Sequence, residues 1–139
     1  MAKVLLTDAY VTVSIDNIAG YVRYVRSREA YPSLDVVRDV HQRVGMVLSL
    51  LPRSALGLLI DMREAPSRSD DAFEVEIVRI IENMHSYFRV HAALVKSAVG
   101  KLQVQRIAKS AGRTDPSVFS TEPEALAYLA AKSKVGGPR

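Results

Sequence analysis

Residues 56–60 read LGLLI, an uninterrupted apolar run that is followed by Asp61. Such a run, short and flanked by polar residues, is typical of a central strand that is covered on both faces of its sheet. Two further apolar segments, residues 90–95 (VHAALV) and 118–119 (VF), predict strands later in the chain. Segments with helical spacing separate these strands, and such alternation predicts mainly parallel pairing with helices on the sheet faces.

The N-terminal segment has the pattern of a hairpin. Residues 11–15 (VTVSI) alternate apolar and polar side chains, residues 17–20 (NIAG) supply a turn, and residues 21–26 (YVRYVR) are rich in β-branched and aromatic types. A short strand over residues 3–7 is predicted before this hairpin. The expected fold is therefore α/β, with a small mixed, mainly parallel sheet, an N-terminal hairpin and about four helices.

Helix boundaries follow from capping residues and apolar spacing. Ser33 is the expected N-cap of the first helix, which Pro52 stops. Its predicted buried stripe is Val36, Val40, Val44, Val47 and Leu51. A second helix follows the loop over residues 63–71, with Glu76 expected off its apolar face. That face is predicted to contain Phe73, Ile77, Ile80, Ile81, Met84 and Phe88. A third helix is expected over residues 100–111, and a fourth from the capping box at 121–124 (TEPE) through Ala131.

Length and composition bound the protein to one domain. The chain has 139 residues, and we expect residues 1–132 to form the domain and residues 133–139 a flexible tail. It contains no cysteine, which excludes disulfides, thiolate nucleophiles and cysteine-based zinc sites. No run of ~18 apolar residues and no signal-peptide pattern is present, so we expect a cytoplasmic protein that does not enter a membrane.

Several stretches together resemble a known group. They are LLIDMREAP at residues 58–66, ALV at 93–95 with GKLQVQR at 100–106, and VF at 118–119 before EALAYL at 124–129. Over about residues 11–130 the chain resembles bacterial STAS-like domains, which are related to anti-sigma-factor antagonists. The resemblance implies a non-enzymatic protein that binds a kinase or a sigma-factor regulator. It also implies that phosphorylation of a serine at a strand-to-helix turn would break that binding.

The loop after residue 60 departs from the antagonist pattern. In that family the strand is followed by Asp, a Ser-Ser or Ser-Thr pair and Gly, whereas here Met62 and Arg63 follow Asp61. Serines come later, so Ser67 and Ser69 are the possible phosphorylation sites. The partner-binding residues predicted from this loop are Asp61, Arg63, Glu64, Ser67, Arg68, Ser69 and Asp70. The alternative is a solvated loop in which Asp70 or Asp71 caps the helix and Arg63 pairs with an acid.

Charge is distributed unevenly along the chain. No acid occurs between Asn83 and Thr114, while this stretch contains Arg89, Lys96, Lys101, Arg106, Lys109 and Arg113. Gly100 and Lys101 begin a predicted helix, where free amides favour anions, and are a candidate anion site. The alternative is a set of solvated helix faces. Nucleic-acid binding is not expected, because no aromatic residues are interleaved with these bases.

Catalytic and metal-binding patterns are missing from the sequence. The histidines lack metal-ligand spacing, there is no G-x-S-x-G motif, and nothing in the spacing requires Asp61 to act with His91. We therefore expect no catalytic residue, cofactor or metal. The leading hypothesis is a non-enzymatic regulatory protein-interaction module acting as a switch in bacterial signalling. The alternative is a carrier or sensor of a small anionic or lipophilic ligand. The edge of the hairpin could also support a homodimer.

Overall fold

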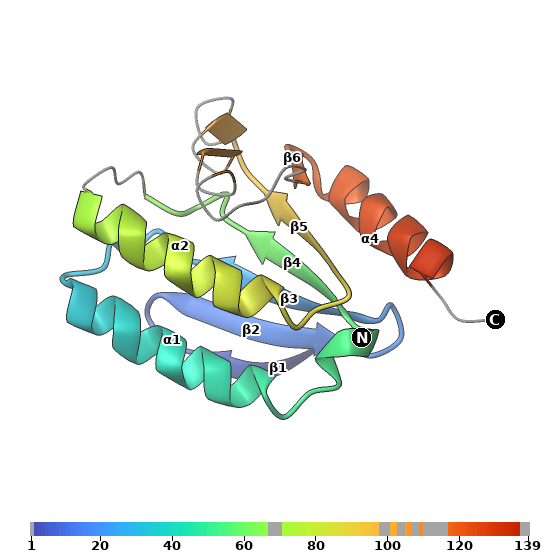
Figure 1. Ribbon diagram of the computed structural model, residues 1–139, viewed down its shortest axis with the longest axis horizontal. Coiled ribbons are helices and arrows are strands. Elements are labelled where there is room, and N and C mark those ends of the chain that lie inside the picture. The colour runs from blue at the N-terminus through green and yellow to red at the C-terminus, as the bar shows by residue number, and fades with distance from the viewer. Residues whose placement is uncertain are drawn as a thin grey trace.

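The computed structural model describes residues 2–66, 71–97, 101–102, 105–106, 109 and 117–136. Six strands form one sheet in which their spatial order is their chain order (Figure 1). The strands are β1 (Ala2–Thr7), β2 (Val11–Asp16), β3 (Tyr21–Arg26), β4 (Gly57–Asp61), β5 (Val90–Leu94) and β6 (Val118–Phe119). Pairing is antiparallel from β1 to β3 and parallel from β3 to β6. The α/β class, the N-terminal hairpin and the mainly parallel later strands are confirmed.

The turn between β2 and β3 explains why the hairpin forms there. The carboxylate of Asp16 accepts hydrogen bonds from the amides of Ile18 and Ala19, at 3.1 and 2.9 Å. Gly20 then adopts a φ of 79°, a left-handed conformation that costs other residue types about 1–2 kcal/mol. These local features place the two strands in register with Asp16 opposite Tyr21.

Two helices cover one face of the sheet, α1 (Leu34–Leu48) and α2 (Asp71–His85), with the short 3₁₀ helix η1 (Arg53–Ala55) between α1 and β4 (Figure 1). Ser33 is the N-cap of α1 as predicted, and its hydroxyl accepts a hydrogen bond from the Val36 amide at 3.3 Å. The predicted stripe was wrong in part. The buried residues of α1 are Val37, Val40, Val44 and Leu48.

Two predictions about the second helix also need correction. Phe88 packs in the core but lies after the end of α2, because the helix stops at His85. Glu76 is 8% exposed rather than on the solvated side. Its carboxylate is held by Arg38 of α1 at 3.3 Å and by Arg79 of α2. Burial of this acid is thus compensated by two guanidinium groups.

The last helix, α4 (Glu122–Gly136), lies against the opposite face of the sheet. The Thr121 hydroxyl donates to the Glu124 carboxylate at 2.8 Å, at the predicted capping box. The helix continues to Gly136 instead of ending at Ala131. Residues 132–135 are compatible with a helix, and lysines near a C-terminus interact favourably with the helix dipole. Of the predicted helix over 100–111, residues 101, 102, 105, 106 and 109 are helical and the others lie outside the described residues.

The sheet separates two hydrophobic cores. Leu58 and Ile60 of β4 face α1 and α2, in a core that also contains the buried residues of β2 and β3. Leu59 faces α4 and packs with Ala92, Leu94, Ala125 and Leu129. Over the described part of the chain, α4 contacts β4, β5 and β6, and Tyr21 and Arg23 of β3 also reach it, whereas the same face of β1 and β2 has no helix over it. No described helix combines the length and apolar character needed to cross a bilayer.

Candidate functional site

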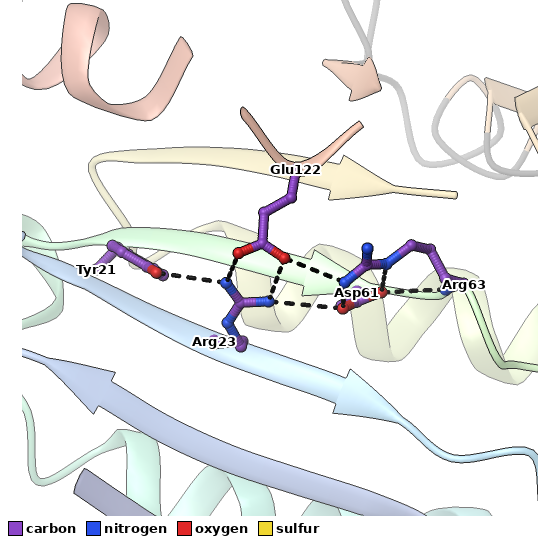
Figure 2. A network of polar contacts seen from close by, with 5 residues as sticks. All are labelled: Tyr21, Arg23, Asp61, Arg63 and Glu122. Carbon is purple, nitrogen blue, oxygen red and sulfur yellow. Dashed lines mark hydrogen bonds and ion pairs between the residues drawn. The ribbon is translucent and has the colours of Figure 1, made fainter. Parts of the chain in front are cut away.

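Charged side chains from three separate segments meet at the carboxyl end of β4 (Figure 2). Asp61 is the last residue of β4, and Arg63 follows it. Arg23 lies on β3, opposite Leu59 in the parallel pairing of β3 with β4. Glu122 is the first residue of α4. Because Arg23, Leu59 and Asp61 point to the α4 face, the sheet brings both strand residues to the N-terminus of that helix.

Asp61 is the most buried of the four charged residues, with a side chain that is 8% exposed. It accepts three hydrogen bonds from Arg63. The backbone amide and Nε of Arg63 donate to Oδ1 at 3.1 and 3.0 Å, and Nη2 donates to Oδ2 at 2.7 Å. A carboxylate that accepts from both an amide and a forked guanidinium is held in a single orientation. Asp61 therefore fixes the start of the loop over residues 62–66.

Arg23 connects β3 with α4. Its guanidinium donates to both carboxylate oxygens of Glu122, with Nη2 to Oε2 at 2.7 Å and Nη1 to Oε1 at 3.3 Å. Nη1 also lies 3.6 Å from Oδ2 of Asp61, and Nη2 donates to the Tyr21 hydroxyl at 3.4 Å. Arg63 reaches the same helix end, because its Nη2 is 3.1 Å from Oε1 of Glu122. Both arginines thus bridge the same two carboxylates.

The electrostatic effects in this cluster favour the charged form of every member. Burial alone would raise the pKa of Asp61, but the hydrogen bonds and charge of Arg63, with the charge of Arg23, hold it below its ordinary value. The hydrogen bond from Arg23 lowers the pKa of Glu122. The pKa of Arg63 is raised, chiefly by its hydrogen bond with Asp61. Burial would lower the pKa of Arg23, but the contacts with Glu122 outweigh it and raise that pKa.

This geometry decides what the cluster can do chemically. Two guanidinium groups and two carboxylates balance each other, and both acids are stabilised as anions. A general base near neutral pH needs a pKa close to the working pH, which is the opposite of the shift on Asp61. The arrangement is suited to holding the loop and the end of α4 in position, and to contacting a charged group.

The predicted loop residues have different positions. Asp61 and Arg63 belong to the cluster, and the pairing of Arg63 with an acid, which was the alternative to partner binding, is confirmed. Glu64 and Pro66 are exposed on the loop that the cluster anchors. The remaining predicted residues, Ser67, Arg68, Ser69 and Asp70, lie outside the described residues.

Arg23 and Glu122 were missed by the sequence reasoning. They are 99 positions apart in the chain, and only the fold brings them together. One signal was present, because Arg23 and Tyr21 occupy alternate positions of a strand next to the predicted central strand. Polar residues at such positions must face a polar partner or solvent.

Asp61 and His91 do not come together. In the pairing of β4 with β5, His91 is opposite Leu58 and Leu94 is opposite Asp61. Paired residues of neighbouring strands share a face, and residues 58 and 61 face opposite sides. His91 therefore points toward α1 and α2, while Asp61 points toward α4. A catalytic pair made of these two side chains, which the sequence left open, is not formed.

Of the candidate anion site at Gly100 and Lys101, the structure describes Lys101. Gly100 lies outside the described residues. The Lys101 amide donates to the Ser97 carbonyl at 2.9 Å, so this donor is already engaged. Lys96, Lys101, Arg106 and Lys109 are exposed, as the alternative of solvated faces requires. Among the residues that the structure describes, no group of three or more acidic, histidine or cysteine side chains is arranged to hold a metal ion.

Comparisons with known proteins identify no family for this chain, so its class is defined by the structure alone. No protein-family model matches the chain. No curated protein and no solved structure matches it either. The fold and the site therefore define an α/β protein with a mixed six-stranded sheet and an ion cluster at the carboxyl end of β4.

Proposed function

We propose that this protein is a non-enzymatic regulatory module of the STAS-like type, and that it binds a regulatory protein, a kinase or a sigma-factor regulator. The contact surface would comprise the loop that starts at Asp61 and the first turns of α2. This surface lies beyond the carboxyl end of a parallel strand and before a helix, where open α/β sheets commonly bind ligands.

The first support is the way in which the loop is anchored. Asp61 and Arg63 hold its start by three hydrogen bonds, and Glu122 ties Arg63 to α4. A surface that is fixed before binding loses less conformational entropy when a partner docks. Glu64 and Pro66 stay exposed on this fixed base.

The observation that carries the proposal is the exposure of Val75. This aliphatic side chain lies in the second turn of α2 and is 70% exposed, in a segment, residues 61–76, whose sequence contains six acids and two arginines. An apolar contact point next to charged residues is the composition of a protein-binding surface, with an apolar centre and a polar rim. The expected partner therefore presents an apolar side chain surrounded by basic groups.

Affinity capture from the cells that make the protein tests this proposal. The wild-type chain and the variant Val75→Ser would be used as baits, and captured proteins identified by mass spectrometry. A kinase or a sigma-factor regulator should be captured by the wild type and reduced about tenfold with Val75→Ser, since loss of one central apolar contact weakens binding by about 1–2 kcal/mol. Phosphate on Ser67 or Ser69 in the same sample would support a switch.

Met46→Ser is the matched control. Met46 is 65% exposed but lies near the C-terminal end of α1, so its replacement removes a similar apolar side chain from a different place. The proposal is contradicted if both variants capture the same proteins as the wild type. It is also contradicted if both lose them equally.

A further inference from the structure

The contacts of Glu122 have the geometry of a bound ligand. Its carboxylate receives hydrogen bonds from Arg23 at 2.7 and 3.3 Å and from Arg63 at 3.1 Å. The two guanidinium groups come from β3 and from the segment after β4, and they converge on one carboxylate (Figure 2). Two arginines that donate to the same oxygens are a common arrangement for recognising a carboxylate or a phosphate.

The two arginines are more firmly held than the Glu122 carboxylate that lies between them. The side chain of Arg23 is 22% exposed and that of Asp61 is 8% exposed. Asp61 holds Arg63 by accepting hydrogen bonds from Nε and Nη2 of its guanidinium group. Glu122, in contrast, is 35% exposed, is the first residue of α4 and is held through its contacts with the two arginines. Rotation of this side chain would leave the arginines in place, positioned by Asp61 and Tyr21.

We infer that Arg23 and Arg63 form a binding site for a small oxyanion, a carboxylate or a phosphate group, and that the carboxylate of Glu122 occupies it as an internal competitor. Without Glu122 the cluster consists of two guanidinium groups and the single carboxylate of Asp61, which leaves one positive charge. An incoming anion restores the balance. Arg63 is 37% exposed, and the site borders the part of the sheet that α4 does not cover, so an anion can reach it from solvent.

This site adjoins the surface proposed for a regulatory protein and shares Arg63 with its loop, but it requires different side chains for binding. It depends on Arg23, Arg63 and Glu122 and not on Val75. The two proposals can therefore fail separately, because capture of a protein partner is tested with Val75→Ser and anion binding is tested with Glu122 variants. The anion site also differs from the turn at Lys101, where the described amide is already engaged.

The test is a titration of inorganic phosphate, and separately of acetate, into the full chain at constant ionic strength kept with sodium chloride. The thermal midpoint is recorded for the wild type and for Glu122→Ala. A ligand that binds only the folded state raises the midpoint with concentration. Removing an internal competitor should tighten the apparent binding of the preferred anion about tenfold or more. The anion that raises the thermal midpoint at the lower concentration, phosphate or acetate, is the one that the two arginines prefer.

Glu64→Ala is the control, because it removes one negative charge from the neighbouring loop over residues 62–66 and leaves both arginines unchanged. The double variant Glu122→Ala/Arg63→Gln should lose the response gained by Glu122→Ala. Equal responses of Glu122→Ala and Glu64→Ala would overturn the inference, since net charge alone would then explain them. An absent response in Glu122→Ala would also overturn it. Glu122→Gln, which keeps the shape of the side chain, gives the same comparison if the alanine variant does not fold.

Discussion

His41 of α1 is held by two hydrogen bonds that determine which ring nitrogen carries the proton. Nδ1 lies 2.8 Å from the Val37 carbonyl oxygen, and Nε2 lies 2.6 Å from the Tyr24 hydroxyl. A carbonyl only accepts, so Nδ1 donates to it, and in the neutral ring Nε2 then accepts from Tyr24. Burial favours this neutral form of the imidazole, because it disfavours the charged form. It fills the space between α1 and β3 as a structural residue.

Burial is the main reason that the pKa of His41 lies below its ordinary value. The nearby charge of Arg26 lowers this pKa further. The hydrogen bond to the Val37 carbonyl and the charges of Asp8 and Glu76 act in the opposite direction but do not outweigh burial. In a protonated His41, Nε2 would become a donor, and the hydrogen bond with the Tyr24 hydroxyl would have to reverse its direction.

The first prediction is a loss of stability under mildly acidic conditions. The folded pKa of His41 is below the unfolded value of about 6.5, so the unfolded state binds more protons as the pH falls. The contribution of neutral His41 to the free energy of unfolding is present in full above the unfolded pKa, and it decreases as the pH falls below that pKa. Urea unfolding measured from pH 7.5 to pH 5 should show this decrease in the wild type and a smaller one in His41→Gln. Equal decreases in both proteins would show that another group is responsible.

The carboxylates act in a separate pH range. A hydrogen bond from Arg23 lowers the pKa of Glu122, and one from Arg79 lowers the pKa of Glu76. Burial would raise the pKa of Asp61, but the contacts with Arg63 outweigh it and lower this pKa. Their stabilising effect is present above the unfolded values of about 4 and is lost as the pH falls through the folded values. The measurement on His41 is therefore made above the range in which these acids titrate.

At the level of elements, the strands were more predictable than the faces of the helices. Residues 21–26 form β3 as predicted, because β-branched and aromatic residues favour a strand locally. The stripe of α1 was misplaced because the chain offers valines at both 36 and 37, and the spacing of valines alone does not choose between them. Only packing against the sheet selects Val37 and Leu48.

Buried charges were the least predictable feature. Arg26 is the last residue of β3 and is 5% exposed, on the same face as Val22 and Tyr24. Its guanidinium donates to the carbonyls of residues 10, 27 and 29, and it lies 4.2 Å from the centre of the Tyr31 ring. These acceptors are supplied by the folded loop around it. A sequence pattern therefore indicates a polar residue here but not its burial.

The candidate site was predictable from one of its three segments. The apolar run that ends at Asp61 indicated a strand end followed by a loop, and Asp61 and Arg63 were singled out there. Arg23 and Glu122 required the three-dimensional placement of β3 and α4 relative to that strand end. Long-range ion pairs leave no periodic pattern in a single sequence, so this part had to come from the structure.

The second prediction concerns the attachment of α4. Glu122 ties its first turn to Arg23 and Arg63, whereas the rest of the helix is held by a small core that includes Ala125 and Leu129. Glu122→Gln should raise hydrogen exchange of the amides of residues 125–127 about fivefold, which corresponds to about 1 kcal/mol of local stability. Exchange in α1 should not change.

Glu64→Gln serves as the comparison for this experiment, because it removes a negative charge from an exposed position of the neighbouring loop. If Glu64→Gln accelerates exchange in α4 as much as Glu122→Gln does, the ion pairs with the arginines do not hold the helix end.

At the level of the whole molecule, the sheet has two unlike edges. β6 is formed by Val118 and Phe119 alone, while β1 spans Ala2–Thr7. Val4 on β1 is 59% exposed, and Lys3 and the irregular register between Val4 and Leu6 are the features that limit pairing of this edge with another strand. The hairpin edge that was predicted to support a homodimer is covered by β1, so the longer free edge is β1 itself.

The third prediction is weak self-association through β1. Light scattering across a range of protein concentrations should show an increase in mass at high concentration only, because Lys3 and the irregular register weaken pairing of this edge with a second copy. Val4→Lys should keep the protein monomeric at all concentrations, since it places a charge on the edge. Val75→Lys is the control at a distant exposed valine. An unchanged mass profile in Val4→Lys would remove β1 from consideration as the contact.

The match between spatial order and chain order in the sheet also bears on how the protein forms during synthesis. Each strand is added at the outer edge of those made before it, beginning with the hairpin, and no later strand has to insert between two earlier ones. The parallel strands join through helices that emerge from the ribosome immediately before them. The nascent chain can therefore assemble from its N-terminus onward, with each new unit covering apolar surface left open by the last.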